Sequence, residues 1–307
     1  MNFQFKKYQA LGNDYIVIDP RQFSLVPVAE AVKVICDRNF GVGSDGILLG
    51  PLSSVSDLRG LPEGRMAEGV NPWLRIFNPD GSEAEKSGNG LRIFCLYLAE
   101  QRYVGNDAFY VNTKGGRVLA LVENIDPPSI RIDMGKPCFS AREAGLETDK
   151  EELLLAKLDI PGQNLPGKPY EANFVSMGNP HCVIFVDEPT ADLAKRLGPL
   201  VERHPWFPHA TNVQFAKVLD RHSMRIEIWE RGAGYTLASG SSSCAAVSVA
   251  KRLGLVEGKV TMNMPGGQLE LDVSDDSVIM KGPALGVFEG CFSGALLANL
   301  GSLGALG

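Results

Sequence analysis

The sequence predicts an α/β protein of the α+β type with two pseudo-symmetric lobes, each a mostly antiparallel sheet wrapped around a central helix. Two observations lead to this fold class. Short apolar segments bounded by Gly, Pro, Asn and Asp are typical of strands, and they dominate the sequence. Three segments also recur in the same order in both halves of the 307-residue chain, whose length fits about two domains.

The recurring segments indicate an internal duplication. They are residues 8–19 and 174–187, residues 75–90 and 227–242, and the hairpins VNTKGGRVLALV and MNMPGGQLELDV. In the second pair, a strand and a polar turn lead into Ser-Gly at the start of an apolar helix, which aligns Ser87 with Ser239. One such match could arise by chance because Gly-Asn and Gly-Gly are common turn signals, but three in order favour duplication.

The central helices are expected at residues 88–102 and 240–253, because both segments are apolar on several faces, as buried helices are. Shorter helices are expected at residues 28–38, 150–158 and 191–202. The N-terminal lobe should cover residues 1–129 and the C-terminal lobe residues 130–282, with the boundary where Asp-Pro-Pro-Ser interrupts the strand pattern. The segment from about residue 283 to residue 307 is expected to return to the first lobe.

The composition excludes several kinds of partner. The formal net charge is −6 and the charges are interspersed without a basic stripe, so nucleic acid is not expected. No apolar run reaches the roughly 18 residues of a membrane span, and the first residues alternate like a strand rather than a signal peptide. The six cysteines show neither a CxxC pair nor Cys/His metal spacing, which predicts reduced thiols, no metal site and a cytoplasmic location.

Ser87 and Ser239 each precede the start of a predicted buried helix. The free N–H groups of a helix N-terminus bind anions, and the small residues at 88–90 and 240–242 let a ligand approach the backbone closely. Two such turns that face each other across one cleft would form a carboxylate cradle with a hydroxyl on either side. The simpler interpretation is that each serine is only an N-cap, a role that serine favours.

Asparagines recur where the predicted strands meet turns. They are Asn13, Asn78, Asn89, Asn179 and Asn212. Each alone is typical of a turn, because Asn tolerates turn geometry. Together with Glu230 and Arg231, they are suited to hold the ammonium and carboxylate groups of an amino acid. A lone histidine beside a turn is usually structural, but His181 lies in the duplicated Gly-Asn element, which makes it a candidate site residue.

Five motifs together resemble the diaminopimelate epimerases. They are FGVGSDGILL, RIFNPDGSEAEKSGNGLRIF, GNPHCVIFVD, ATNVQFAKV and ERGAGYTLASGSSSCAA, in order and across nearly the whole chain. The resemblance implies a diaminopimelate epimerase-like fold and an epimerase or racemase that converts LL- to meso-diaminopimelate or acts on a related amino acid. It also implies a reaction without pyridoxal phosphate, metal or other cofactor, in which two cysteines move the α-proton on opposite faces of a small-molecule substrate.

The resemblance further implies roles for individual residues. Those expected to bind the reacting carboxylate are Gly88, Asn89, Gly240 and Ser241. Those expected to hold the distal amino-carboxylate end are Asn13, Asn78, Asn179, Asn212 and Arg231. His181 and Glu230 would support the acid–base pair.

Both catalytic cysteine positions are serine in this chain, at Ser87 and Ser239. A helix N-terminus tunes a thiol toward the acidity that catalysis near neutral pH requires, whereas a serine hydroxyl needs a neighbouring base. The serines are therefore either engineered, natural in a divergent isomerase whose substrate has a more acidic C–H, or part of a catalytically silent amino-acid-binding or regulatory protein on an epimerase scaffold. An isomerase or cyclase of a non-amino-acid metabolite is a further alternative function. The Ser241-Ser242-Ser243 run also departs from the Thr-Gly of many members, which favours natural divergence.

Two further segments depart from the resemblance. Residues 51–72 form a longer link than the family usually has, and their Gly, Pro and Ser content predicts a loop, either an inert insertion or a lid. The apolar, Gly-rich C-terminal tail is expected either to pack on a partner subunit, as in a homodimer, or to stay disordered.

Overall fold

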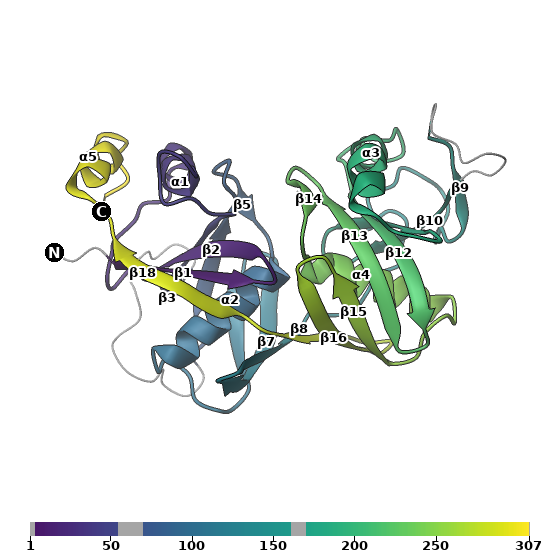
Figure 1. Ribbon diagram of the computed structural model, residues 1–307, viewed down its shortest axis with the longest axis horizontal. Coiled ribbons are helices and arrows are strands. Elements are labelled where there is room, and N and C mark those ends of the chain that lie inside the picture. Colours follow the sequence, from purple (N-terminus) through teal and green to yellow (C-terminus); the bar gives the residue numbers. More distant parts are fainter. Residues whose placement is uncertain (1–3, 55–69, 161–169, 307) are drawn as a thin grey trace. The chain divides into compact units, whose positions relative to one another are not determined.

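The computed structural model describes residues 4–54, 70–160 and 170–306 (Figure 1). The chain forms two compact units. The first lies within Met1–Ile132 and Gly282–Gly307, and the second within Asp133–Lys281. The family fold class predicted above, a mixed α/β architecture with buried central helices, is confirmed.

The first unit is a sheet in the order β18-β1-β2-β3-β4-β6-β7-β8, with the short β5 added beside β4. Only the β2–β3 and β4–β6 pairs of this series are parallel. The strands are β1 Gln4–Ala10, β2 Asn13–Ile18, β3 Ile47–Leu52, β4 Trp73–Phe77, β5 Glu83–Ala84, β6 Phe109–Thr113, β7 Gly116–Ile125, β8 Pro128–Asp133 and β18 Leu285–Cys291. The helices are α1 Ala29–Cys36, α2 Gly88–Glu100 and α5 Gly294–Ser302.

The second unit repeats this order as β9-β10-β11-β12-β13-β15-β16-β17, with β14 beside β13. The parallel pairs of this series, β11–β12 and β13–β15, fall at the matching places. The strands are β9 Ala156–Leu158, β10 Tyr170–Ser176, β11 Pro180–Phe185, β12 Asn212–Asp220, β13 Ser223–Glu230, β14 Gly234–Thr236, β15 Lys259–Met264, β16 Gly267–Val273 and β17 Val278–Gly282. The helices are α3 Ala191–Glu202 and α4 Gly240–Arg252. The repeated strand order and directions match the predicted pseudo-symmetry.

Each unit encloses one helix, α2 in the first and α4 in the second (Figure 1). Residues 88–98 of α2 are all buried, and α4 is buried along nearly its whole length. The apolar residues on several faces of each segment explain this, because a helix that is apolar all round has no face suited to water. The helices predicted at 88–102, 240–253 and 28–38 form with slightly shorter bounds, and the one at 191–202 forms as predicted.

The helix predicted at residues 150–158 is wrong. This segment is irregular until β9, which pairs with β10. Leu155 has a φ of 53°, and its backbone N–H donates to Oδ1 of Asn173 at 2.9 Å. A left-handed leucine interrupts a right-handed helix, so the leucine-rich pattern does not continue as one.

The C-terminal tail is ordered and packs on the first unit, so the expectation that it stays disordered is wrong. Its ring of Phe292 stacks on Phe5 at 4.8 Å between centroids, and Leu300 of α5 is fully buried in the core of the first unit. Val26 N–H donates to the carbonyl of Ala305 at 2.9 Å. Most of the predicted 51–72 loop lies outside the described residues. In the described parts of the chain, no helix has the length and apolar character needed to cross a membrane.

Candidate active site

The first unit presents Ser87 at the N-terminus of α2. Ser87 is extended (φ −136°, ψ 119°) and its Oγ accepts a hydrogen bond from Gly90 N–H at 3.0 Å, so it caps the helix. The hydroxyl oxygen of Tyr15, on β2, lies 3.2 Å from the same Oγ. Gly88 and Asn89 follow in the buried first turn. The hydroxyl predicted at a buried helix start is therefore present, and it has a phenol beside it.

The second unit presents Ser239 in the same way at the N-terminus of α4. Ser239 is extended (φ −145°, ψ 126°) and its Oγ accepts from Ser242 N–H at 3.4 Å. Ser243 Oγ donates to the Ser239 carbonyl at 2.8 Å, which ties the cap to the next turn. Gly240 is buried and Ser241 is partly exposed. The two serines thus have matching local geometry, and the Oγ of each accepts the hydrogen bond that caps its helix.

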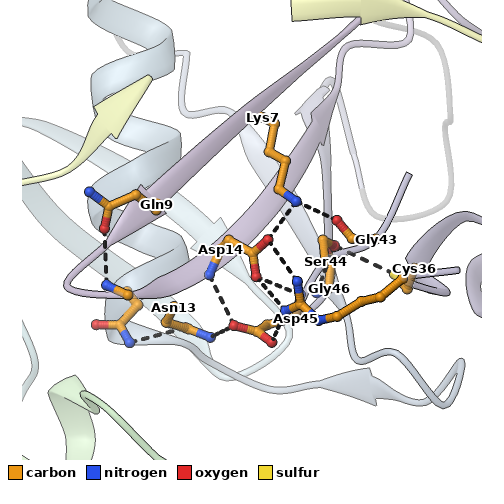
Figure 2. A network of polar contacts seen from close by, with 12 residues as sticks. Lys7, Gln9, Asn13, Asp14, Cys36, Gly43, Ser44, Asp45 and Gly46 are labelled. Atoms are coloured by element: carbon orange, nitrogen blue, oxygen red, sulfur yellow. Dashed lines mark hydrogen bonds and ion pairs between the residues drawn. The ribbon is translucent and has the colours of Figure 1, made fainter. Parts of the chain in front are cut away.

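Asn13 and Asn89 lie together in the first unit. Asn89 Nδ2 donates to Asn13 Oδ1 at 3.0 Å, and Asn13 Nδ2 donates to Asp45 Oδ2 at 2.9 Å (Figure 2). Arg92, from the buried face of α2, donates to Asn89 Oδ1 at 2.8 Å. Both amides therefore have a defined orientation. Asn78 lies apart in the β4–β5 turn, where its Nδ2 donates to Ser82 Oγ at 3.0 Å.

Asp45 belongs to an ionic network that the sequence did not reveal (Figure 2). Arg38 bridges Asp14 and Asp45 at 2.8 Å to each carboxylate, and Lys7 Nζ lies 2.7 Å from Asp14. Burial raises the pKa of Asp14, but hydrogen bonds from Arg38 and Lys7 outweigh it and hold the pKa at about 2. The carboxylate stays charged, so the network keeps Asp45 in place as the acceptor for Asn13. The only signal for it was the Ser-Asp-Gly turn inside FGVGSDGILL.

In the second unit, His181 and Asn179 form one cluster. His181 Nε2 lies 2.9 Å from Asn179 Oδ1, and its Nδ1 lies 3.1 Å from Nε2 of Gln214. Complete burial lowers the pKa of His181 to about 3, and the positive charge of Arg231 adds to this effect. The imidazole is therefore neutral near neutral pH. Gln214, on β12, lies inside the motif ATNVQFAKV, but it was not predicted as a site residue.

Asn212, Glu230 and Arg231 lie at the adjoining strand ends. Asn212 donates to the carbonyl of Pro180 at 2.9 Å and accepts from the backbone N–H of Arg231 at 3.0 Å. Glu230 Oε1 accepts from Thr236 Oγ1 at 3.0 Å. Arg231 is exposed, and its guanidinium forms no ion pair with any residue that the structure describes. An exposed guanidinium beside a strand end is available for a carboxylate.

All the predicted site residues except Asn78 thus lie in two groups, one in each unit. The group of the first unit is Asn13, Ser87, Gly88 and Asn89, and that of the second is Asn179, His181, Asn212, Glu230, Arg231, Ser239, Gly240 and Ser241. Within the described ranges, no group of three or more His, Cys, Asp or Glu side chains is arranged to hold a metal ion.

A family model described as diaminopimelate epimerase matches residues 5–140 and 173–286. The chain belongs to the diaminopimelate epimerase family. Diaminopimelate epimerase 2 of Nostoc sp. is 46% identical over 277 residues, which cover 89% of each chain. The chloroplastic diaminopimelate epimerase of Oryza sativa subsp. japonica is 37% identical over 300 residues, or 93% of this chain and 79% of the relative.

Solved structures show that the epimerase fold extends to more distant proteins. A phenazine biosynthesis protein of the PhzF family from Enterococcus faecalis superposes with a TM-score of 0.63 at 13% identity, covering 95% of this chain and 100% of the other. A hydroxyproline epimerase from Agrobacterium vitis gives a TM-score of 0.62 at 13% identity, covering 93% and 89%. At these identities the likeness concerns the fold alone.

Proposed function

We propose that this member of the diaminopimelate epimerase family binds diaminopimelate, or a related amino acid, and is an epimerase scaffold whose two proton-transfer positions carry serine. The observation that carries the proposal is the matched pair of Ser-Gly helix starts, each an N-cap followed by small residues in the first turn. Family membership supports an amino-acid substrate. The reaction would invert the α-carbon without a cofactor.

The residues proposed to bind the reacting carboxylate are Gly88 and Asn89 in the first unit and Gly240 and Ser241 in the second. Helix N-termini favour anions because their first N–H groups lack partners within the helix. The residues proposed to hold the distal amino-carboxylate end are Asn13 and Asn78 in the first unit and Asn179, Asn212 and Arg231 in the second. The exposed guanidinium of Arg231 supports this role, because a planar guanidinium binds a carboxylate through two parallel hydrogen bonds.

We assign the proton-transfer positions to Ser87 and Ser239, with His181 and Glu230 as supporting groups. The hydroxyls are poor proton carriers near neutral pH, because matched acidity governs general acid–base catalysis. His181 is neutral and buried, so its support is a hydrogen bond rather than a charge. We therefore expect the chain to exchange the α-proton of diaminopimelate very slowly or not at all.

A catalytically silent amino-acid-binding protein is the second candidate. It is favoured by the capping role of both serines, whose oxygens accept backbone N–H groups at 3.0 and 3.4 Å. Binding of diaminopimelate without deuterium exchange at the α-carbon would support this candidate. Failure to bind any amino acid by a folded chain would favour an isomerase or cyclase of a non-amino-acid metabolite.

The deciding experiment is α-deuterium incorporation in heavy water, read by mass spectrometry, together with calorimetric titration of meso-diaminopimelate. The matched variant is Ser87→Cys/Ser239→Cys. Exchange by this variant and not by the chain supports an epimerase scaffold with silenced catalysts. Exchange by neither, with both proteins folded, removes the epimerase assignment.

We also propose that the protein is a cytoplasmic homodimer. Leu285, Val287 and Phe288 on β18 are 45–53% exposed, and β1 is the only strand that pairs with β18 among the described residues. An apolar, exposed edge strand suits a partner. The six cysteines are all unpaired, which fits a reducing compartment. Light scattering of the chain and of Phe288→Lys tests the dimer, and a chain that is monomeric throughout the micromolar range would refute it.

A further inference from the structure

A buried chain of polar contacts leads from Asn179 to the start of α4. His181, Gln214 and Ser242 are each fully buried. Nε2 of Gln214 donates to His181 Nδ1 at 3.1 Å and to Ser242 Oγ at 3.0 Å. At the other side of the imidazole, Nε2 lies 2.9 Å from Asn179 Oδ1. Each ring nitrogen of His181 thus has a defined partner.

These contacts select one tautomer of the neutral ring. Because the nitrogen of the Gln214 amide faces the ring and an amide nitrogen only donates, Nδ1 of His181 accepts with its lone pair in this orientation. The single ring proton then lies on Nε2, from which it is donated to Asn179 Oδ1. The amide of Asn179 consequently has its oxygen tied to His181. Gln214 therefore orients Asn179 indirectly, through the imidazole of His181, and among the described contacts none joins Gln214 to Asn179.

The duplication provides an internal comparison for this position. In the first unit, Ile16 pairs with Ile47, and in the second, the aligned Cys182 pairs with Val213. The next residues along β3 and β12 are Leu48 and Gln214, which therefore correspond.

The partners of these two residues correspond as well. Ser242 aligns with Gly90, and a Cβ built on Gly90 would lie 3.0 Å from Cδ2 of Leu48. The first unit therefore fills this position with an apolar leucine against a glycine. Since the same fold accommodates Leu48 and Gly90 at this position, it does not require the polar pair Gln214 and Ser242.

The amide of Gln214 uses its two hydrogens for hydrogen bonds and leaves its oxygen without one in the described part of the chain. Oε1 of Gln214 is the one buried side-chain nitrogen or oxygen without a hydrogen-bond partner among the described residues. Here both amide hydrogens go to His181 and Ser242.

We propose that Gln214, anchored by Ser242, is a positioning residue that holds His181 as the Nε2–H tautomer and so orients Asn179 for ligand binding. The tautomer follows from the contacts alone, whereas the effect on ligand rests on the proposed function, in which Asn179 belongs to the distal pocket. Ser242 also donates its backbone N–H to Ser239 Oγ, so the same contact chain reaches the proposed proton-transfer position.

The test is NMR of the full chain with isotope-labelled histidine, which shows which nitrogen of His181 carries the proton; His181→Asn assigns the signal. The matched variant is Gln214→Leu/Ser242→Gly, which installs the pair that the first unit already packs at Leu48 and Gly90. The unaltered chain should show Nε2–H. The variant should show a smaller fraction of Nε2–H, because Nδ1 no longer receives the Gln214 hydrogen bond and only Asn179 Oδ1 still favours that tautomer. A proton on Nδ1 in the unaltered chain, or an unchanged tautomer in the variant, overturns the inference.

Calorimetry with meso-diaminopimelate measures the consequence for the ligand. The variant should bind about fivefold more weakly, the equivalent of about 1 kcal/mol for one net hydrogen bond. Gln268→Leu is the control, because Gln268 is an exposed glutamine whose amide bonds only Asn263 in the described structure. Equal affinity of the variant and the chain overturns the role of Gln214 in orienting Asn179. If the unaltered chain does not bind the ligand, the proposed function is refuted. The NMR experiment then still tests whether Gln214 sets the tautomer of His181.

Discussion

Restoring thiols at the two helix starts should change stability and chemistry in opposite directions. Ser87 and Ser239 each cap a buried helix through Oγ, and sulfur is a much weaker acceptor than a hydroxyl oxygen. Loss of a serine cap costs about 1 kcal/mol, and the two caps share no hydrogen-bond partner, so their costs should add to about 2 kcal/mol. Ser87→Cys should cost more than Ser239→Cys, because its cap bond is shorter and Tyr15 also meets the hydroxyl.

Urea and thermal denaturation of the chain, both single variants and the double variant measure this cost. A cap loss of about 1 kcal/mol lowers the melting midpoint by about 2–4 °C for a folding unit of this size. Deuterium exchange on the same samples should appear only in the double variant, because a helix N-terminus lowers a thiol pKa into the useful range. The reasoning is refuted if the double variant is as stable as the chain, or if the chain with serines exchanges rapidly.

Three further predictions concern single substitutions. Gly198→Ala should destabilise by about 1–2 kcal/mol in urea, although alanine favours helices, because its Cβ would lie 2.4 Å from the Trp229 ring; Gly294→Ala, with open space around it, should not destabilise. His181 has a folded pKa of about 3, below its unfolded value of 6.5, so its contribution to stability is complete above pH 6.5 and is lost as pH falls toward 3; His181→Asn should flatten the denaturation midpoint across this range, and an unchanged slope would assign the acid sensitivity to other groups. Arg231→Lys should weaken diaminopimelate binding about tenfold, because lysine cannot form the bidentate contact, which is worth about 1.5 kcal/mol; equal affinity in calorimetry would remove Arg231 from the site.

Much of the fold could be predicted because its determinants are local. The Ser-Gly caps, the apolar helices after them and the Gly-Gly hairpins are each written in a few consecutive residues, and the duplication showed them twice. The 150–158 helix failed for a local reason as well. Its leucines suit a helix, but Leu155 adopts a left-handed conformation that is stabilised by Asn173, 18 residues away. A periodic pattern cannot reveal a contact of that kind.

Site residues could be predicted where a helix cap lies inside a recognisable motif. They could not be predicted where the contact forms only after distant strands have paired. Ser87 and Ser239 stand out by their position before apolar helices. Tyr15, Asp45 and Gln214 meet their partners only after β2 and β3, or β11 and β12, pair in register. Each of the three contacts joins residues at least 28 positions apart. Sequence reasoning on one chain has no access to such registers.

The return of the C-terminus to the first unit sets an order for synthesis on the ribosome. β1 pairs with β18, so residues near position 5 can form their strand pairing only after residues near position 290 have been synthesised. The second unit is continuous in sequence, from Asp133 to Lys281, and has all its strands before the last segment is translated. We therefore expect the second unit to finish folding first, while the sheet of the first unit keeps an unpaired β1 edge until β18 has been synthesised. Deletion of residues 285–306 should then leave the second unit folded while exposing Phe5 and the β1 edge, and the truncated protein should aggregate through that edge.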